Sequence, residues 1–534
     1  MGFASWGAMR NQAAPGAASF AEPVPKQTSS GASASGYSYR RHEPERSVLY
    51  GVVAEHWNTF LAEAEREADG RGIPSYVKEE FEAYLKCGIL QYGFLRVRCE
   101  SCTEERLVAF SCKKRGFCPS CGGRRMGETA AKLADQVIPQ VPVRQWVLSI
   151  PIAMRYWCAS NPKLVTGVLE IIIRGIRGFY QDRAKAEGIQ QSETGAITFV
   201  QRFGSALNLN VHFHILFLDG VYRVPSFGGA QEAEARASSD SHAEKSPTFV
   251  GVKGPSGEEI RALLGKLADR IIRHLQRKGY LKEDETASGE GDDPLQSQSP
   301  LFASCVAASI QHKTALGDRA GERVRKLGVH PLESQVTGHS SASDRGFSLH
   351  AGVVVRAQER DKLERLIRYV ARPSLALERL EKTSDGNLIY RLKKAYSDGT
   401  THVKFSAMEL IEKLVALIPR PRMHLVRYHG ILAPNARLRS RIVPKVKTET
   451  TTTDAEKREV TPQRIAWAKL LKRVFDIDIS KCGMCQGQVK VIAAVQDSHV
   501  MAKILEHLKM PVKPPFIAPA RAPPQGSLAF GDSC

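Results

Sequence analysis

The chain has no apolar run long enough for a membrane-spanning helix. None of its segments approaches the roughly 18 uninterrupted apolar residues that such a helix needs, and Ile171–Ile173 fit one face of an amphipathic helix instead. The Ala/Gly/Ser-rich segment Met1–Tyr39 contains no apolar signal core, and the chain has no internal repeat. These absences exclude a membrane protein. An organellar transit peptide stays open, since Glu22 is the only acid before Glu43.

Acidic residues are scarce relative to basic ones. The chain has 76 Lys and Arg against 56 Asp and Glu, a net charge of +20 and a pI of about 9.5. Five basic residues and no acid lie in Cys112–Arg125, and eight and no acid in Ile418–Lys447. Contacts between such residues and phosphates release condensed counterions, so the surplus predicts a polyanionic partner. The alternative is charge that only keeps the surface solvated.

The hydrophobic fraction of 42% and the five tryptophans exclude a wholly disordered chain. A length of 534 residues predicts two to four domains. Composition and pattern divide the chain into a disordered leader (1–42), a helical and cysteine-rich region (43–135), an α+β region (140–224 and 301–400), a low-complexity insertion or linker (225–300), a basic extension (401–447), a small C-terminal Cys-x2-Cys unit (462–510) and a disordered tail (511–534).

Hydrophobic periodicity predicts the main elements. Helices are expected from residue 48 to about 61 and at 77–85, 128–137, 162–186, 258–278 and 361–370, and strands at 143–150, 196–202, 208–219 and 346–356. Asp361 and Glu364 stand at capping-box spacing before the last helix.

The eleven cysteines do not resemble a disulfide framework. Cys99-x2-Cys102 and Cys118-x2-Cys121 are close pairs fifteen residues apart in a basic setting, which indicates a metal ion in a reducing cytoplasm. Four thiolates suit tetrahedral zinc and leave no open position, so we expect a structural zinc ribbon. Cys87 and Cys112 are surplus, and either could replace one of the four or serve a second ion. Cys482-x2-Cys485 is a lone pair that His499 or Cys534 could complete. The ribbon would hold basic residues in a fixed array for DNA: Lys113, Lys114, Arg115, Arg124 and Arg125.

The segment Leu209–Leu218 contains the pair His212 and His214. Alternate residues of a strand share a face, so both imidazoles project together while Val211, Phe213 and Ile215 face the core. Two such imidazoles make half of a divalent-metal site open to phosphate oxygens. Taken alone, the pair is more typical of ordinary exposed or hydrogen-bonded histidines than of a metal site.

Several motifs in order resemble the rolling-circle transposases of the insertion-sequence ninety-one type, which include those of common-region elements. The matching pieces are the cysteine cluster that ends Cys-Pro-Ser-Cys, the segment 208–222, Leu349-His350-Ala351, Arg368-Tyr369-Val370-Ala371-Arg372-Pro373, the segment 428–434 and Cys482-Gly-Met-Cys485. The resemblance covers about residues 48 to 510 and implies an HUH nuclease domain with a central antiparallel sheet, preceded by a helical and zinc-ribbon domain.

The resemblance also implies a mechanism. Tyr369 would attack a scissile phosphate, leaving a 5′-phosphotyrosine and a free 3′-OH. His212 and His214 would hold Mg²⁺ or Mn²⁺, with His350 as the first candidate for a third ligand and Gln201 as the second. Arg365, Arg368 and Arg372 would neutralise phosphate charge. Some relatives have a second tyrosine one helical turn on; here that position is Pro373, so successive cleavages need a second protomer or reuse of the released tyrosine.

The basic extension mixes arginines with aromatic rings, which suits single-stranded or hairpin DNA. Its DNA-binding candidates are Arg422, Arg427, Arg437 and Arg439. We therefore expect a cytoplasmic, nucleoid-associated bacterial transposase that binds element ends and target DNA, with host replication proteins as further partners.

Three alternatives stay open. A non-catalytic zinc-ribbon regulator derived from a transposase would not need His212, His214 and Tyr369 together. A replication initiator or relaxase would share the chemistry but lack the cysteine cluster. A tyrosine recombinase would use His424 and Arg427, but Tyr428 follows too closely to be its nucleophile.

Overall fold

The structure is a computed structural model that describes residues 42–67, 72–224, 247–281, 293–328, 340–444, 473 and 480–522. In these segments no helix has the length and apolarity to cross a membrane. Residues 1–41 of the predicted leader and the acidic run at 283–292 lie outside the described residues.

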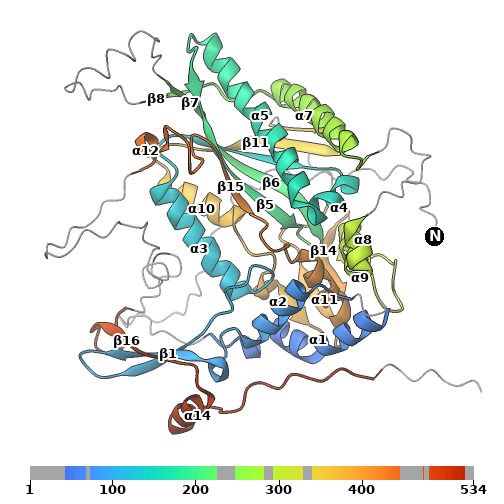
Figure 1. Cartoon of the computed structure of the whole chain (residues 1–534), viewed down its shortest axis with the longest axis vertical. Coiled ribbons are helices and arrows are strands. Elements are labelled where there is room, and N and C mark those ends of the chain that lie inside the picture. Colours follow the sequence, from blue (N-terminus) through green and yellow to red (C-terminus); the bar gives the residue numbers. More distant parts are fainter. Residues whose placement is uncertain are drawn as a thin grey trace, which may run out of the picture.

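A six-stranded antiparallel sheet forms the centre of the molecule (Figure 1). Its strand order is β10-β11-β3-β6-β5-β15. The strands are β3 (Val143–Ser149), β5 (Gly195–Phe203), β6 (Leu209–Leu218), β10 (Ser341–Asp344), β11 (Phe347–Val355) and β15 (Val426–Gly430). β5 and β6 are buried along nearly their whole length because they are rich in apolar residues and helices cover both faces. The four strands predicted from the sequence are confirmed, each within two residues at its ends.

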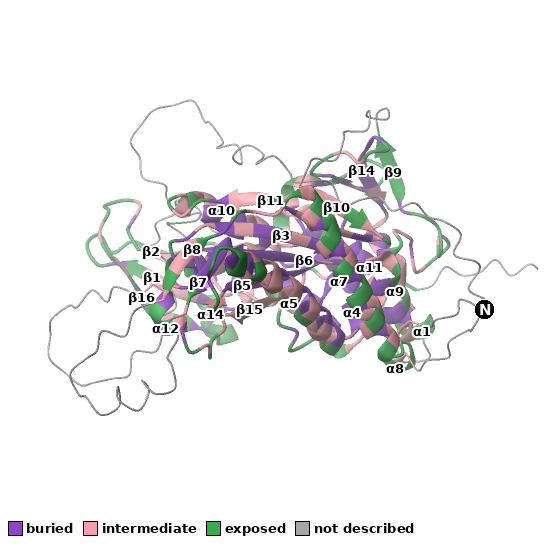
Figure 2. Ribbon diagram, turned by 90° about the horizontal axis from the view of Figure 1, so that it is seen from above, coloured by how far each residue is buried: buried purple, intermediate pink, exposed green. Residues whose placement is uncertain are grey.

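Helices cover the two faces of this sheet. One face, which includes Phe199 and Leu216, packs against α3 and α10. The other, which includes Trp146 and Phe217, belongs to a larger core with α4, α5, α7 and α9. Figure 2 shows the sheet as the buried centre and exposed residues on the outer sides of α5 and α7. These helices are α3 (Pro119–Gln136), α4 (Ile152–Ser160), α5 (Pro162–Ala186), α7 (Gly257–Arg277), α9 (Pro300–Ile310) and α10 (Arg360–Val370).

Local sequence signals set several helix ends. The Asn161 side chain accepts hydrogen bonds from the backbone N–H groups of Lys163 and Leu164, at 3.0 and 3.1 Å, and so caps α5. Capping boxes start α7 and α11 (Ala407–Leu417). The predicted capping box of α10 is wrong: this helix begins at Arg360 without a side-chain cap, and the Glu364 carboxylate accepts from Arg368 at 2.5 Å instead.

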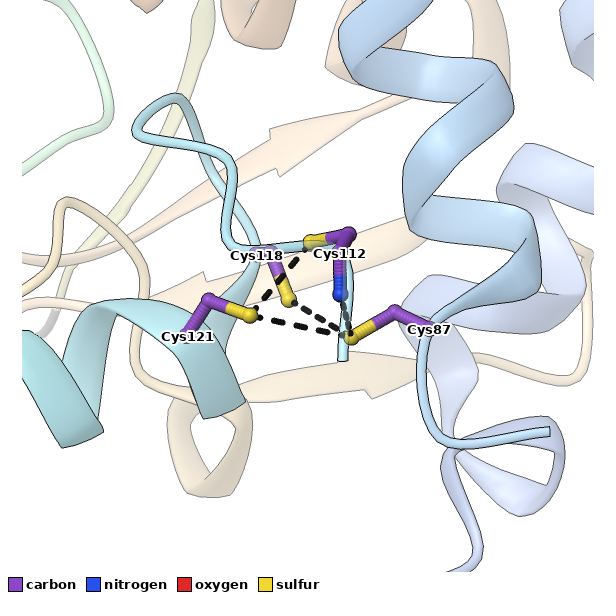
Figure 3. A group of neighbouring side chains, drawn as sticks. All are labelled: Cys87, Cys112, Cys118 and Cys121. Atoms are coloured by element: carbon purple, nitrogen blue, oxygen red, sulfur yellow. Dashed lines mark hydrogen bonds between the residues drawn. The ribbon is translucent and has the colours of Figure 1, made fainter. Parts of the chain in front are cut away.

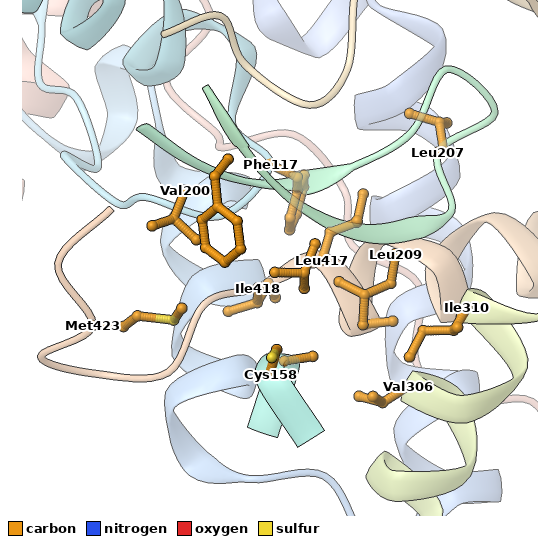
Figure 4. Packing of buried hydrophobic residues seen from close by; sticks show 14 of the residues in the cluster. Phe117, Cys158, Val200, Leu207, Leu209, Val306, Ile310, Leu417, Ile418 and Met423 are labelled. Carbon is orange, nitrogen blue, oxygen red and sulfur yellow. The ribbon is translucent and has the colours of Figure 1, made fainter. Parts of the chain in front are cut away.

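The N-terminal helices share a core with the rest of the protein. After η1 (Pro44–Arg46), α1 (Val48–Glu67) and α2 (Ser75–Lys86) pack together through stacked Trp57 and Phe81 rings, 3.8 Å apart between centroids. Phe117 continues this cluster. Figure 4 shows Phe117 in the same buried cluster as Val200 of the sheet and Leu417 of α11. The predicted domain 43–135 is therefore fused to the predicted α+β region through one apolar core.

A separate three-stranded sheet of order β16-β1-β2 pairs a C-terminal strand with two N-terminal strands. It lies at the lower left of Figure 1, beside α14. Its elements are β1 (Phe94–Cys99), β2 (Glu105–Ala109) and β16 (Val489–Val495), with η2 (Leu90–Tyr92) and α14 (Ser498–His507) packed on it. Within the predicted small C-terminal unit at 462–510, β16 pairs with β1, so this unit packs on the N-terminal hairpin.

Two smaller sheets complete the fold. Their strand orders are β12-β13-β14-β9 and β4-β7-β8. The remaining elements are β4 (Ser192–Glu193), β7 (Gly220–Arg223), β8 (Thr248–Gly251), α8 (Pro294–Gln298), β9 (Arg325–Gly328), η3 (Leu377–Arg379), β12 (Leu380–Lys382), β13 (Leu388–Arg391), β14 (Thr400–Phe405) and α12 (Arg439–Ile442).

Two predicted accessory segments belong to the core instead. Within the supposed insertion at 225–300, α7 buries an apolar stripe that includes Leu264 and Ile271 against α5 and the sheet. Within the supposed basic extension at 401–447, all residues of α11 except the first two are buried, and β15 forms the sheet edge beside β5. Composition is basic there because loops and one strand face carry the arginines, while the helix is apolar.

Candidate active site and metal centres

Four cysteines converge between α2 and α3. Cys87 follows α2, Cys112 follows β2, and Cys118 and Cys121 stand at the start of α3 (Figure 3). The Sγ atom of Cys121 lies 3.4 Å from that of Cys112 and 3.8 Å from that of Cys87. All four sulfur atoms lie within 4.8 Å of one another. Tetrahedral Zn²⁺ with Zn–S bonds of about 2.3 Å requires sulfur atoms about 3.8 Å apart, so this cluster fits a structural zinc ion.

A second group of four cysteines lies at the tip of the small sheet. It consists of Cys99, Cys102, Cys482 and Cys485, again with all sulfur atoms within 4.8 Å of one another. The prediction that Cys99 and Cys102 share one ion with Cys118 and Cys121 is therefore wrong. Cys99 ends β1 and Cys102 lies in the turn to β2, so this pair belongs to the hairpin tip. Cys118 and Cys121 instead take Cys87 and Cys112, which were predicted as surplus or as substitutes.

The two histidines lie on β6, in the middle of the central sheet. His212 is paired across the sheet with Ser149 of β3 and Gln201 of β5, and His214 with Val147 and Phe199. Both rings therefore face α3 and α10, and their centroids are 5.0 Å apart. The shared face that alternation predicts is confirmed.

Both imidazoles are held in the neutral form by their surroundings. Burial lowers the pKa of His212 to about 4 and lowers that of His214 well below its ordinary value; the positive charge of Arg372 adds to both shifts. The Nδ1–H group of His212 donates a hydrogen bond to the carbonyl oxygen of Asn210 at 2.9 Å, which leaves Nε2 of this ring without a proton. The amide Nε2 of Gln145 lies 2.8 Å from Nδ1 of His214 and can only donate to it, so a neutral His214 ring carries its proton on Nε2. Nε2 of His214 becomes a lone-pair donor when the Gln145 amide turns its oxygen toward Nδ1.

Tyr369 approaches this pair from α10. Its ring is half-buried, perpendicular to that of His214 and 6.2 Å from it between centroids. The guanidinium carbon of Arg372 lies 4.5 Å from the Tyr369 ring centroid, and Nζ of Lys393 lies 4.4 Å from it. Lys393 is exposed and follows β13 by two residues, and sequence reasoning missed it because no motif links it to α10. A phenol, two imidazoles and two cations thus meet at one place.

The two candidates for a third metal ligand, His350 and Gln201, differ in their position relative to the histidine pair. The ring of His350 is on β11, beyond β3, and its Nδ1 contacts the Gly352 N–H at 3.5 Å. Among the described residues, the His/Cys/Asp/Glu groups close enough to hold an ion are the two cysteine clusters, so His350 does not join the histidine pair. Gln201 lies directly across from His212; its Nε2 donates to Val370 O at 2.7 Å, and its buried Oε1 has no hydrogen-bond partner. The Asn210 Oδ1 atom is buried without a partner too.

The arginines on α10 and just after it make different contacts. Arg368 is bound to Glu364, whose other oxygen accepts from Arg473 at 2.6 Å. Arg365 is exposed. Of the three predicted phosphate-binding arginines, Arg372 is the one that contacts Tyr369.

The basic residues of the first cysteine cluster are mostly bonded within the protein. Arg115 donates to Met423 O at 2.8 Å, and Arg125 donates to the carbonyls of Lys113 and Lys114. Two more form ion pairs: Lys114 with Glu79 and Arg124 with Glu128. Through these contacts Arg115 and Arg125 stabilise the loop before α3. Their DNA contacts stay a prediction.

The basic residues after α11 line a pocket. Arg422 and Arg427, with His424 and Lys163, surround a cavity of about 390 Å³ beside α5. Arg427 also donates to Thr166 Oγ1 at 2.7 Å. Two others lie further on: Arg437 is exposed, and Arg439 stacks on Tyr428 at 5.8 Å.

A larger basic cavity was not predicted. It has a volume of about 1020 Å³ between α5 and α7 and is lined by Arg174, Arg270, Arg273 and Arg277 among others. The helical spacing of the three arginines on α7 was available in the sequence, but the segment was interpreted as a linker.

Two family models match the chain in tandem. The model described as "Transposase zinc-binding domain" matches residues 52–150, and the model described as "Putative transposase" matches residues 195–440. The first range contains the cysteine cluster of Figure 3, and the second contains both histidines and Tyr369. Comparison with curated proteins and with solved structures gave no match. The chain is a DNA-binding transposase of the insertion-sequence ninety-one type with a structural zinc site.

Proposed function

We propose that this transposase is an HUH enzyme that nicks and transfers a single DNA strand by rolling-circle transposition. The observation that carries the proposal is the meeting of His214 on β6 with Tyr369 on α10, with 6.2 Å between ring centroids, although 155 residues separate them in the sequence. A tyrosine packed only as a core residue would not need two neutral imidazoles and two cations around it.

The residues present fit a divalent cation. His212 would bind it through Nε2, and His214 would do so once the Gln145 amide turns its oxygen toward Nδ1. The unpartnered Oε1 of buried Gln201 would supply an oxygen ligand on the neighbouring strand. Nitrogen and amide-oxygen ligands are compatible with Mn²⁺ and Mg²⁺. When bound, such an ion would neutralise charge on a scissile phosphate and make its phosphorus more electrophilic. We favour Gln201 over His350 because the His350 ring is turned toward Gly352.

The chemical step belongs to Tyr369. Its phenolic oxygen forms a bond to phosphorus while the bond from phosphorus to the 3′ oxygen breaks, and the proton of the phenol ends on that leaving oxygen. The products are a 5′-phosphotyrosine and a free 3′-OH. The phosphodiester bond energy is kept in the covalent link, so attack by another 3′-OH completes strand transfer without a nucleoside triphosphate.

Arg372 and Lys393 would place two positive charges next to the reacting phosphate. Both cations lie within 4.5 Å of the Tyr369 ring centroid, so a phosphate that receives the phenolic oxygen comes within their reach. Fixed cations at the point where negative charge develops lower the barrier more than mobile ones would.

Position 373, one turn after Tyr369, is proline, which leaves a single nucleophile on α10. Two successive cleavages then require a second protomer or release and reuse of Tyr369. Single-stranded or hairpin element ends are the proposed substrates, and host replication proteins would restore the second strand.

The test mixes purified protein, Mg²⁺ or Mn²⁺ and end-labelled single-stranded oligonucleotides that cover the ends of its element. We expect a covalent adduct to the 3′ fragment on a denaturing protein gel, lost with EDTA and in Tyr369→Phe. Tyr428→Phe is the matched control, since Tyr428 packs on the same apolar cluster and should keep the adduct. DNA binding without any adduct in the wild type would contradict the proposal and favour a non-catalytic regulator.

A further inference from the structure

The pair Cys482-x2-Cys485 finds its partner at the opposite end of the sequence. The Sγ atom of Cys485 lies 3.4 Å from that of Cys99, and that of Cys482 lies 3.5 Å from that of Cys102. The residues of these two contacts are 386 and 380 positions apart. Neither the family match at 52–150 nor the one at 195–440 includes residues 482 and 485.

The two Cys-x2-Cys turns have the same backbone form. The residue after each second cysteine, Thr103 and Gln486, has a φ of 61°. In the C-terminal turn, the Met484 and Gly487 N–H groups point at the sulfur atoms of Cys482 and Cys485, each at 3.4 Å. N–H groups directed at sulfur stabilise thiolates, which is the form that binds metal.

The strands behind these turns hold them face to face. β16 pairs with β1 from Cys99↔Val489 to Phe94↔Val495, and Glu100 N donates to Gln488 O at 2.9 Å. A Cβ atom at position 487 would lie 2.5 Å from Ser101 Oγ and 3.1 Å from Cys99 Sγ. The absence of a side chain on Gly487 therefore allows the two turns to approach each other.

We propose that Cys99, Cys102, Cys482 and Cys485 form a second, tetrathiolate zinc site that ties the C-terminal segment 480–507 to the N-terminal hairpin. Four sulfur atoms at mutual distances below 4.8 Å match the edge of a ZnS₄ tetrahedron, about 3.8 Å. Four thiolates select Zn²⁺ over Mg²⁺ or Mn²⁺, which prefer oxygen ligands. The zinc ribbon of this protein is thus assembled from two halves encoded at opposite ends of the chain.

The ion supplies much of what holds the segment in place. Apolar packing behind the turns is small: the buried residues are Leu90, Phe94, Val495, Met501 and Leu505. Closing a loop of about 380 residues carries an entropy cost that grows only slowly with length, and one ion that links both ends offsets it. Beyond α14 the chain continues along α1, where Ala518 N donates to Ala54 O at 2.9 Å. The site therefore anchors a C-terminal strap across the N-terminal helices.

The two zinc sites differ in access. Cys87, Cys118 and Cys121 are buried, whereas Cys102 and Cys485 are exposed. A chelator therefore reaches the second site first. Loss of that ion frees β16 and α14, while the core beneath the first site stays folded.

Metal analysis of the full chain tests the proposal. Wild-type protein should contain two zinc ions per chain, and the double variant Cys482→Ser, Cys485→Ser should contain one. Cys158→Ala is the control, because Cys158 is buried outside both clusters and should leave two ions. A double variant that retains the wild-type zinc content would overturn the proposal.

Hydrogen exchange locates the effect. In the double variant, amides of residues 94–99 and 489–495 should exchange at least tenfold faster, with residues 209–218 unchanged. Unchanged exchange at 489–495 would contradict a zinc tether. If the double variant unfolds, zinc release from the wild-type protein is measured instead. A colorimetric chelator should remove one ion quickly and the other slowly. Release of both ions in a single phase would contradict two sites of unequal access.

Discussion

The buried histidines predict an unusual pH dependence of metal binding. Burial lowers the pKa of His212 to about 4 and lowers that of His214 well below its ordinary value. A histidine of ordinary pKa, about 6.5, is only about 9% neutral at pH 5.5. If both ligands titrated in that way, Mn²⁺ affinity would fall by about 100-fold between pH 7.5 and pH 5.5. With the pKa of His212 at about 4 and that of His214 well below its ordinary value, both rings stay neutral, and we expect a change below about twofold.

The stability of the fold, unlike its affinity for Mn²⁺, should fall with pH in this range. Because the folded-state pKa lies below the unfolded one, the unfolded chain takes up more protons as the pH falls below about 6.5. Stability is therefore lost from that pH down to about 4, and His212 alone accounts for about 1.3 kcal/mol between pH 7.5 and pH 5.5. Circular dichroism at both pH values would verify that the protein is still folded.

The assay is Mn²⁺ binding to zinc-loaded protein followed by electron paramagnetic resonance at pH 7.5 and pH 5.5. The double variant His212→Ala, His214→Ala gives the background from other sites. A loss of affinity near 100-fold in folded wild-type protein would refute the reasoning, because it would mean that the imidazoles titrate like exposed ones.

Three further predictions follow from side-chain contacts. Lys393→Met should lower the single-turnover nicking rate by about 10- to 100-fold with DNA affinity changed less than threefold, because the cation acts at Tyr369; an unchanged rate would remove Lys393 from the site. Gln201→Leu should weaken Mn²⁺ binding at least tenfold while His350→Leu leaves it unchanged, and the reverse result would make His350 the third ligand. Asp219→Asn should cost about 3–5 kcal/mol in urea unfolding, because it leaves Arg144, whose side chain is only 13% exposed, without its carboxylate, and a cost below about 1 kcal/mol would contradict that.

Sequence reasoning succeeded where the signal is local. The helix Pro162–Ala186 was predicted with its observed ends because Asn161 and Pro162 are a strong start signal and its apolar stripe has helical period. The common face of His212 and His214 follows from strand alternation alone. Both features depend on neighbours within a few residues.

Sequence reasoning failed where the contacting residue or strand is distant in the sequence. The spacing of Cys99-x2-Cys102 fits a shared ion with Cys118-x2-Cys121 as well as with Cys482-x2-Cys485, and only the pairing of β1 with β16 decides between them. Likewise α7 looked like part of a linker, because low-complexity residues surround it and its packing on α5 is a tertiary fact. The contact of Lys393 with Tyr369 has no sequence signal.

The central claim is that Tyr369 is the nucleophile of strand cleavage, and peptide mapping of the DNA adduct tests it most directly. Wild-type protein is reacted with a cleavable single-stranded oligonucleotide and Mn²⁺, the DNA is trimmed with nuclease, and the digest is sequenced by tandem mass spectrometry. The account predicts a nucleotide linked through its 5′ phosphate to Tyr369. The same nucleotide on another tyrosine, or linkage through a 3′ phosphate, would contradict it.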